Sequence, residues 1–212
     1  MKLILASNNR DKLREIRELM EGTGITIIPQ AEAGFREAVE ETGTTFLENA
    51  RIKARAAMEF TGLPAVSDDS GLEVNAMNGG PGVYSSRFCG DRTYPEACRE
   101  IMDIVDRSDD RGARYCCAVV CCFPDGHEIS AFATTEGEIS REMRGSGGFG
   151  YDPIFVPDGY DCSSAVLSPE QLRRDGDFLA DFTAHMADAA KFMGLHNLNV
   201  IRWDKPSKAF RD

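Results

Sequence analysis

The spacing of apolar residues at the start of the chain predicts a strand, helix and strand in succession. Residues 2–7, KLILAS, form a short apolar run typical of a buried strand. Residues 8–22 then place apolar side chains every three or four positions, which is the period of an amphipathic helix. These side chains are Leu13, Ile16, Leu19 and Met20. A second apolar run at residues 25–29 follows, so the unit favours an α/β layer.

A second amphipathic helix is predicted between a polar, acidic loop at residues 30–43 and Gly62. Thr45 and Glu48 have the spacing of a capping box, which marks a helix start. At about 100° per residue, one face of this helix gathers Phe46, Ala50, Lys53 and Ala57. Lys53 therefore lies within an apolar stripe. Its ammonium must extend to solvent or meet an anion, because an unpaired buried charge is costly.

The stretch at residues 65–77 combines apolar runs with two adjacent acids. We expect residues 65–69, AVSDD, to form a strand, the following Ser-Gly pair to form a turn, and residues 72–77 to form a second strand. Asp68 and Asp69 repel each other unless something positive lies beside them. This repulsion indicates that the fold brings a cation to this point.

A third helix and a β-hairpin follow in the predicted order. The helix begins at Thr93, has Glu96 at capping-box spacing, and turns Cys98, Ile101, Met102 and Val105 inward. Residues 113–123 and 128–135 flank a Pro-Asp-Gly-His turn and predict a long hairpin. A late helix is predicted over residues 183–194. A chain of 212 residues can form one domain, or two small lobes that share a cleft.

The charge of the chain narrows the classes of partner. A net charge of -11 argues against a broad surface for nucleic acid or an anionic membrane, because phosphate groups attract basic faces. A small anionic ligand would need local cations or a divalent metal. No run approaches the roughly 18 apolar residues of a transmembrane helix. The apolar run near the start is too short for a signal peptide.

The cysteines suggest a cytoplasmic protein with reduced thiols. There are seven, and four of them lie within residues 113–123. Adjacent cysteines on a strand point to opposite faces, so these four cannot converge on one tetrahedral metal. We interpret them as small buried side chains in a reducing compartment.

The first motif that could carry chemistry is SNNRDK, at a strand-to-helix junction. Asn8 or Asn9 would cap the helix, whose first free N–H groups would face the preceding loop, with Lys12 one turn further on. Amides, the positive helix end and an ammonium together suit a phosphate. A capped surface helix without a ligand is the alternative interpretation.

The second motif is a set of carboxylates: Glu40 and Glu41 in EETG, and Asp68 and Asp69 in SDDSG. Mg²⁺ takes carboxylate oxygens together with substrate phosphate oxygens, and an aspartate beside it can deprotonate an attacking water. A plain turn and a solvated acidic face are the alternatives.

The third motif is the glycine-rich stretch at residues 145–153, GSGGFGYDP. Its glycines would let the backbone approach a flat ligand, with Phe149 able to stack and Asp152 able to accept hydrogen bonds. A flexible loop is the alternative.

Together the motifs suggest a nucleotide with its phosphates on Lys12 and Lys53 and its base against Phe149. A metal between Glu41 and Asp69 would relieve the acidic repulsion.

In these motifs the chain resembles the inosine triphosphate pyrophosphatases. The resemblance runs in order through SNNRDK, EETGTTFLENARIKA, DDSGLEV, GGPGVYSSRFCG and GGFGYDPIF, over roughly residues 1–156. It implies an α/β fold with a two-lobed mixed sheet, flanking helices and a central nucleotide-binding cleft, with residues 1–212 as a single domain. It also implies a homodimer. The implied reaction is Mg²⁺-dependent hydrolysis of nonstandard purine nucleoside triphosphates such as ITP, dITP and XTP to the monophosphate and pyrophosphate.

The resemblance also implies roles for particular residues. The triphosphate would be held by Ser7, Asn8, Asn9, Lys12 and Lys53. Glu41 and Asp69 would bind Mg²⁺, and Asp69 would also serve as the general base. Further substrate contacts would come from Ser70, Phe149, Gly150, Tyr151, Asp152 and His185, with Phe149 stacked on the base.

The chain departs from the family pattern after residue 160. Met186 occupies the usual arginine position and Leu172 the usual lysine position, and both family side chains read the purine 6-oxo group. Arg173 or Arg174 could substitute. Losing such a contact relaxes discrimination between bases. Two alternatives therefore stay open: the same reaction on a different nucleotide, or a nucleotide-binding protein with weakened catalysis.

Overall fold

The computed structural model describes residues 1–168 and residue 171, and its first elements confirm the predicted strand–helix–strand unit. Strand β1 (Lys2–Leu5) pairs in parallel with β2 (Thr26–Pro29), and helix α1 (Arg10–Leu19) connects them. Asn9 caps α1, since its side-chain oxygen accepts hydrogen bonds from the N–H groups of residues 11 and 12. The side chain predicted to cap is therefore the second of the two asparagines.

Helix α2 (Phe46–Thr61) forms as the capping signals predict. The capping box of Thr45 and Glu48 is complete, and the helix ends at Gly62, which has a positive φ of 66°. Phe46, Ala50, Ala54 and Ala57 are buried. The apolar stripe thus packs on the sheet and fixes the direction in which Lys53 points.

Strand β3 (Ala65–Val74) corrects two predictions. The expected turn at Ser70 and Gly71 is wrong, because a single strand of 10 residues runs through it, paired along its whole length with β5. The separate strand expected over residues 72–77 is wrong too, because β3 ends at Val74 and residues 75–77 form a 3-10 helix. Gly71 serves packing instead. A Cβ at Gly71 would overlap the carbonyl oxygen of Gly82 and lie 2.5 Å from Ser85 Oγ, so the glycine allows this neighbouring segment to approach the strand.

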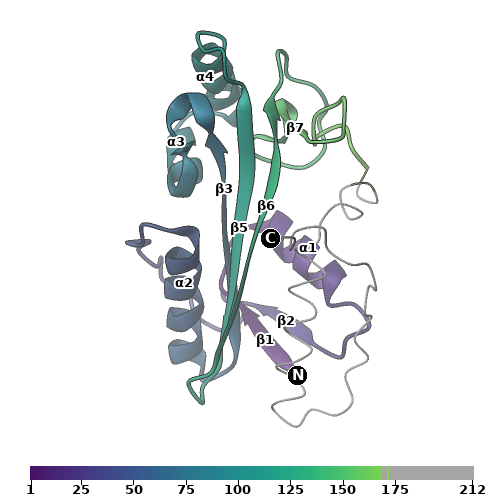
Figure 1. Cartoon of the computed structure of the whole chain (residues 1–212). Coiled ribbons are helices and arrows are strands. Elements are labelled where there is room, and N and C mark those ends of the chain that lie inside the picture. Colours follow the sequence, from purple (N-terminus) through teal and green to yellow (C-terminus); the bar gives the residue numbers. More distant parts are fainter. Residues whose placement is uncertain (169–170, 172–212) are drawn as a thin grey trace, which may run out of the picture.

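One mixed sheet organises the described residues, in the order β2-β1-β3-β5-β6-β7, with β4 (Gly80–Pro81) paired to β3. Strands β5 (Gly112–Cys122) and β6 (Glu128–Ile139) form the predicted hairpin, which extends further than expected. Strand β7 (Phe155–Pro157) closes the far edge. Figure 1 shows β3, β5 and β6 as long strands that link β1 and β2 at one end with β7 at the other.

Several helical segments cover the end of the sheet that carries β7. They are η1 (Asn75–Met77), η2 (Gly82–Tyr84), α3 (Ser85–Cys89), α4 (Tyr94–Val105) and η3 (Asp152–Ile154). The predicted capping box of Thr93 and Glu96 begins α4. Cys98, Ile101 and Val105 are buried, as expected, and Met102 packs beside them. The predicted helix over residues 183–194 lies outside the described residues.

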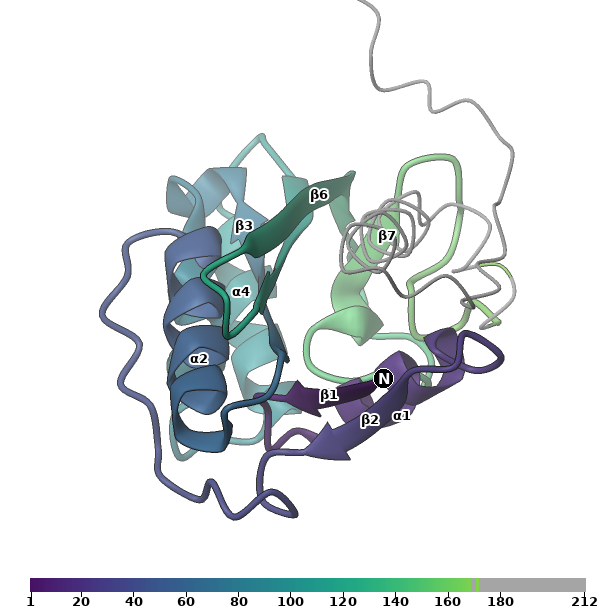
Figure 2. The ribbon, with the colours of Figure 1, turned by 90° about the horizontal axis from the view of Figure 1, so that it is seen from below.

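Separate apolar clusters at the two ends of the long strands give the fold its two lobes. One joins Leu3, Leu5, Ile16 and Val66, and the other joins Leu72, Ile101, Ile154 and Phe155. The view along the strands in Figure 2 places α2 on one side of the sheet and α1 on the other. The α/β, two-lobed mixed sheet with flanking helices is thus confirmed.

The cysteines of β5 alternate between the faces, as the sequence predicts. Cys116 and Cys122 pack against α2, whereas Cys117 and Cys121 belong to the cluster that includes α1. Cys117 is half-buried and the other three are buried. In the part of the chain that the structure describes, no helix is both long enough and apolar enough to cross a membrane.

Candidate active site

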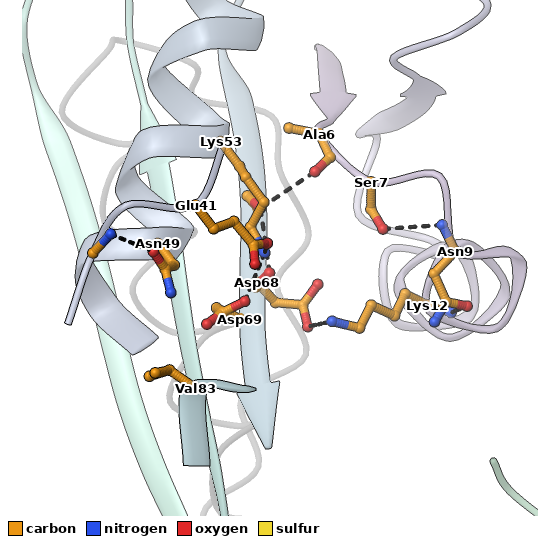
Figure 3. A network of polar contacts seen from close by, with 12 residues as sticks. Ala6, Ser7, Asn9, Lys12, Glu41, Asn49, Lys53, Asp68, Asp69 and Val83 are labelled. Carbon is orange, nitrogen blue, oxygen red and sulfur yellow. Dashed lines mark hydrogen bonds and ion pairs between the residues drawn. The ribbon is translucent and has the colours of Figure 1, made fainter. Parts of the chain in front are cut away.

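The first part of the site is the loop between β1 and α1. Ser7 Oγ accepts a hydrogen bond from the Asn9 backbone N–H at 3.1 Å, and Asn9 in turn caps the helix. Figure 3 shows Ser7, Asn9 and Lys12 on this loop and the first turn of α1. All three residues line the cleft, so the positive end of the α1 dipole lies at the cleft. This arrangement suits an anionic group.

Lys12 lies at the same loop and pairs with Asp68. Their Nζ and Oδ2 atoms are 2.5 Å apart, and both side chains are largely buried. Burial disfavours the ammonium, but the charge of Asp68 and the hydrogen bond to it outweigh that effect and raise the pKa of Lys12 above its ordinary 10.5. Lys12 is therefore fully charged at neutral pH.

Lys53 forms a second ion pair on the opposite face of β3. Its Nζ lies 2.7 Å from Asp69 Oδ1 and 2.9 Å from Glu41 Oε1 (Figure 3). Burial raises the pKa of Asp69 above its ordinary 3.8, the charge of Lys53 opposes this, and Glu41 adds to it. An aspartate whose pKa is raised is a stronger base when ionised.

Two carboxylate oxygens of the aspartates lack a partner within the described part of the chain. Asp68 Oδ1 and Asp69 Oδ2 are buried and accept no hydrogen bond from any described residue. Buried oxygens of this kind suit a hard cation such as Mg²⁺. Within residues 1–168 and 171, however, no group of three His, Cys, Asp or Glu side chains could hold a metal. Glu41 and Asp69 would therefore need further ligands, such as phosphate oxygens of a substrate and water.

The glycine-rich loop lies across the cleft and is held by Asp152. The Asp152 Oδ2 atom accepts the Phe149 N–H at 2.8 Å, and a Cβ at Gly148, whose φ is +65°, would overlap that oxygen. Burial raises the pKa of Asp152, and the Phe149 hydrogen bond opposes it. The Phe149 ring is 37% exposed and lines the cleft, so it is accessible to a ligand.

Tyr151 anchors the same loop to the α3 segment. It is buried, and its hydroxyl donates a hydrogen bond to the Ser85 carbonyl at 2.6 Å. This side chain therefore positions the loop, while the neighbouring Phe149 and Gly150 face the cleft.

Apart from Glu40 and Asp68, the described candidate residues all line one cleft of about 640 Å³. These are Ser7, Asn8, Asn9, Lys12, Glu41, Lys53, Asp69, Ser70, Phe149, Gly150, Tyr151 and Asp152. His185, Met186 and Leu172 lie outside the described residues. The cleft joins an end rich in charged groups to an aromatic loop, so a ligand that fills it combines anionic and flat parts.

Two residues that sequence reasoning did not single out hold the loop that carries Glu41. Arg87 Nη1 donates to the Glu41 carbonyl at 3.3 Å, and Asn49 Oδ1 accepts the Gly43 N–H at 2.8 Å. Asn49 is fully buried, and its Nδ2 has no partner among the described residues. A signal for Asn49 existed, because it lies three residues after Phe46 and four before Lys53 on the apolar stripe.

Fold and site define an α/β protein with a cleft for a phosphate-bearing ligand. The chain belongs to the Ham1 family, whose profile matches residues 3–174. It is 45% identical over 179 residues to a dITP/XTP pyrophosphatase of Thioalkalivibrio sulfidiphilus, covering 82% of this chain and 91% of the relative. A dITP/XTP pyrophosphatase of Cutibacterium acnes is 48% identical over 178 residues, covering 80% and 86%.

Solved structures show the same fold. A HAM1 protein from Coxiella burnetii superposes with a TM-score of 0.81 at 37% identity, covering 89% of this chain and 99% of that chain. The Staphylococcus aureus Ham1 protein gives a TM-score of 0.76 at 32% identity, covering 93% and 100%. The family resemblance seen in the motifs is thus confirmed over most of the chain.

Proposed function

We propose that this protein is a nucleoside triphosphate pyrophosphatase. It hydrolyses nonstandard purine nucleoside triphosphates such as ITP, dITP and XTP to the monophosphate and pyrophosphate. The observation that carries the proposal is the convergence in one cleft of a helix N-terminus with Lys12, the Lys53–Asp69–Glu41 cluster and the Phe149 ring. The names of the dITP/XTP pyrophosphatase relatives support the same reaction.

The reaction needs a group that takes a proton from water as the anhydride bond between the α- and β-phosphates breaks. Asp69 is placed for this role, because its carboxylate lies in the cleft and burial raises its pKa. Lys12 and the N-terminus of α1 would hold the phosphates and stabilise the negative charge on the departing pyrophosphate. Lys53 keeps Asp69 in position.

Mg²⁺ is the cofactor we propose, held by Glu41 and Asp69 together with the substrate. When bound, it would neutralise phosphate charge and polarise the phosphoryl group. The Asp69 Oδ2 atom supports this assignment, because it has no partner among residues 1–168 and 171. Lys53 contacts both carboxylates. Its ammonium offsets their mutual repulsion and so holds them close together before the metal binds.

The test is a nucleotide panel with product identification. Purified protein is incubated with ITP, dITP, XTP, dUTP, ATP and GTP, with and without Mg²⁺, and pyrophosphate is measured separately from orthophosphate. We expect Mg²⁺-dependent pyrophosphate release, fastest with ITP, dITP or XTP. Release of orthophosphate alone would contradict the proposal. Fastest turnover of another nucleotide would support the alternative substrate, and tight binding without turnover would support a binding protein.

We infer further that the protein is a single-domain, cytoplasmic homodimer. The dimer follows from the family resemblance, and the reduced thiols of the seven cysteines agree with the cytoplasm. Sedimentation velocity measures the oligomeric state, and a monomer at micromolar concentration would refute the dimer. Fractionation of the source cells measures the localisation.

A further inference from the structure

Tyr94 lines the candidate cleft, but the proposed reaction gives it no role. It is the first residue of α4, directly after the N-cap Thr93, whose capping box with Glu96 fixes the helix start. The side chain is 37% exposed, as much as the Phe149 ring. A large aromatic side chain so placed is available to a ligand.

The ring of Tyr94 packs on the glycine-rich loop. It meets Tyr151 edge to face, with centroids 5.4 Å apart and an interplanar angle of 86°. Its Cε1 atom lies 3.7 Å from the point where a Cβ on Gly150 would stand. Because Tyr151 is buried and hydrogen-bonded to Ser85, the Tyr94 ring is held in a defined position beside the Phe149 loop.

The hydroxyl of Tyr94 lies beside Ser86, on the side of the ring towards α3. Burial and the neighbouring thiols of Cys89 and Cys98 raise the pKa of this phenol, whereas the Ser86 hydroxyl and the charge of Lys12 act in the opposite direction. Ser86 and Lys12 both line the cleft. The ring therefore borders the aromatic loop and the hydroxyl borders Ser86, in the cleft that Lys12 also lines.

We propose that Tyr94 contacts the sugar of the bound nucleotide and is a specificity-determining residue. The inference rests on the proposed function. In any nucleotide the sugar joins the base to the phosphates, so an exposed side chain that borders the Phe149 loop, in a cleft that Lys12 also lines, is placed to contact the sugar. The phenol hydroxyl can exchange a hydrogen bond with a sugar hydroxyl, and the ring supplies an apolar contact.

The test compares sugars at constant base. The values of kcat/KM for ITP, dITP and 2′,3′-dideoxy-ITP are measured for the wild type, Tyr94→Phe and Tyr94→Leu. One net hydrogen bond corresponds to about two- to tenfold. We expect Tyr94→Phe to lower kcat/KM by that factor for ITP and to leave dideoxy-ITP unchanged. If Tyr94→Phe also lowers kcat/KM for dITP, the contact is to the 3′ hydroxyl. If kcat/KM for dITP is unchanged, the contact is to the 2′ hydroxyl. Tyr94→Leu should lower kcat/KM for all three substrates.

Tyr84→Phe is the matched control, because Tyr84 is 58% exposed and lies outside the cleft lining. Tyr84→Phe should leave the ratios of kcat/KM among the three substrates at their wild-type values. If Tyr94→Phe changed kcat/KM equally for all three substrates, or not at all, the proposed role of Tyr94 would be overturned. Pyrophosphate release by the wild type would still support the proposed pyrophosphatase activity. No pyrophosphate from any of the three with the wild type would instead refute the proposed function and remove the basis for the sugar contact.

Discussion

The two faces of β3 carry similar ion pairs with different charge balance. On the face towards α1, one ammonium, Lys12, meets one carboxylate, Asp68. On the face towards α2, one ammonium, Lys53, meets two carboxylates, Asp69 and Glu41. The adjacent aspartates point apart because successive side chains of a strand alternate. Their mutual repulsion is thus reduced by geometry and by a lysine on each side.

This difference gives the cleft two kinds of binding surface. The α1 face is neutral within its pair and adds the positive end of a helix, which favours an anion. The α2 face keeps one excess negative charge, which favours a cation. Arg87 offsets that excess weakly, since it is 3.9 Å from Glu41 and its side chain is 46% exposed. A metal-bound triphosphate matches both surfaces.

The largest expected effect separates the two aspartates. Asp69→Asn removes the proposed base, so we expect kcat to fall about 10²- to 10⁴-fold while the nucleotide still binds. Asp68→Asn leaves the base in place and alters only the partner of Lys12, so kcat should fall less than about tenfold. Steady-state kinetics and calorimetric titration measure both. Equal losses of kcat in the two variants would show that the two faces of β3 do not have different roles in the reaction.

The two lysines give the next test, on stability. Lys53→Met leaves Glu41 and Asp69 without the ammonium between them, and Arg87 offsets their charge weakly, so we expect a loss of about 1.5–3 kcal/mol in the free energy of unfolding. Mg²⁺ should restore part of this loss. Lys12→Met should cost a similar amount, but Mg²⁺ should restore little, because a single carboxylate remains there. Urea unfolding with and without MgCl₂ measures all four states. Identical Mg²⁺ responses would contradict the charge difference.

Gly71 tests how the α2 face is packed. Gly71→Ala places a methyl group against the Gly82 carbonyl and Ser85 Oγ, so we expect a destabilisation of about 1–3 kcal/mol. Ser70→Ala is the matched control, since it is the neighbouring residue on the opposite face and is half-buried. Thermal and urea unfolding compare them. If Gly71→Ala were no less stable than Ser70→Ala, the close approach at Gly71 would not constrain the fold.

Sequence reasoning succeeded where local signals decide the structure. Capping residues marked the starts of α2 and α4, and the helical period placed Lys53 on the sheet-facing stripe. It failed at Ser70 and Gly71, because Gly71 is required by a segment that begins about ten residues later, which only the tertiary fold brings near. Local turn statistics could not separate that use of glycine from a turn.

The candidate site likewise contains residues that local sequence signals identify and others that depend on the tertiary fold. The phosphate loop, the acidic pair and the glycine loop each have a local signature, so their residues could be found, and their convergence could be inferred by combining them. The pairing of Lys12 with Asp68 and of Lys53 with Asp69 depends on which face each side chain takes. Tyr94 had no signature, since a tyrosine at a helix start is ordinary until the glycine loop is placed beside it.

Asn49 provides the smallest of the expected effects and tests how the α2 face keeps its second carboxylate. Asn49→Ala removes the acceptor of the Gly43 N–H and should cost about 1 kcal/mol in the free energy of unfolding. Because Gly43 lies two residues after Glu41, we also expect the Mg²⁺ concentration for half-maximal activity to rise a few-fold.

Asn75→Ala is the control for this change, because Asn75 hydrogen-bonds Asp110 away from the cleft. A variant at Asn49 that lost stability but kept the wild-type Mg²⁺ requirement would limit this side chain to a structural role. A raised Mg²⁺ requirement, absent in Asn75→Ala, would show that the excess charge of the α2 face depends on a loop held by one buried amide. The α1 face needs no such loop, since Asp68 and Lys12 belong to a strand and a helix.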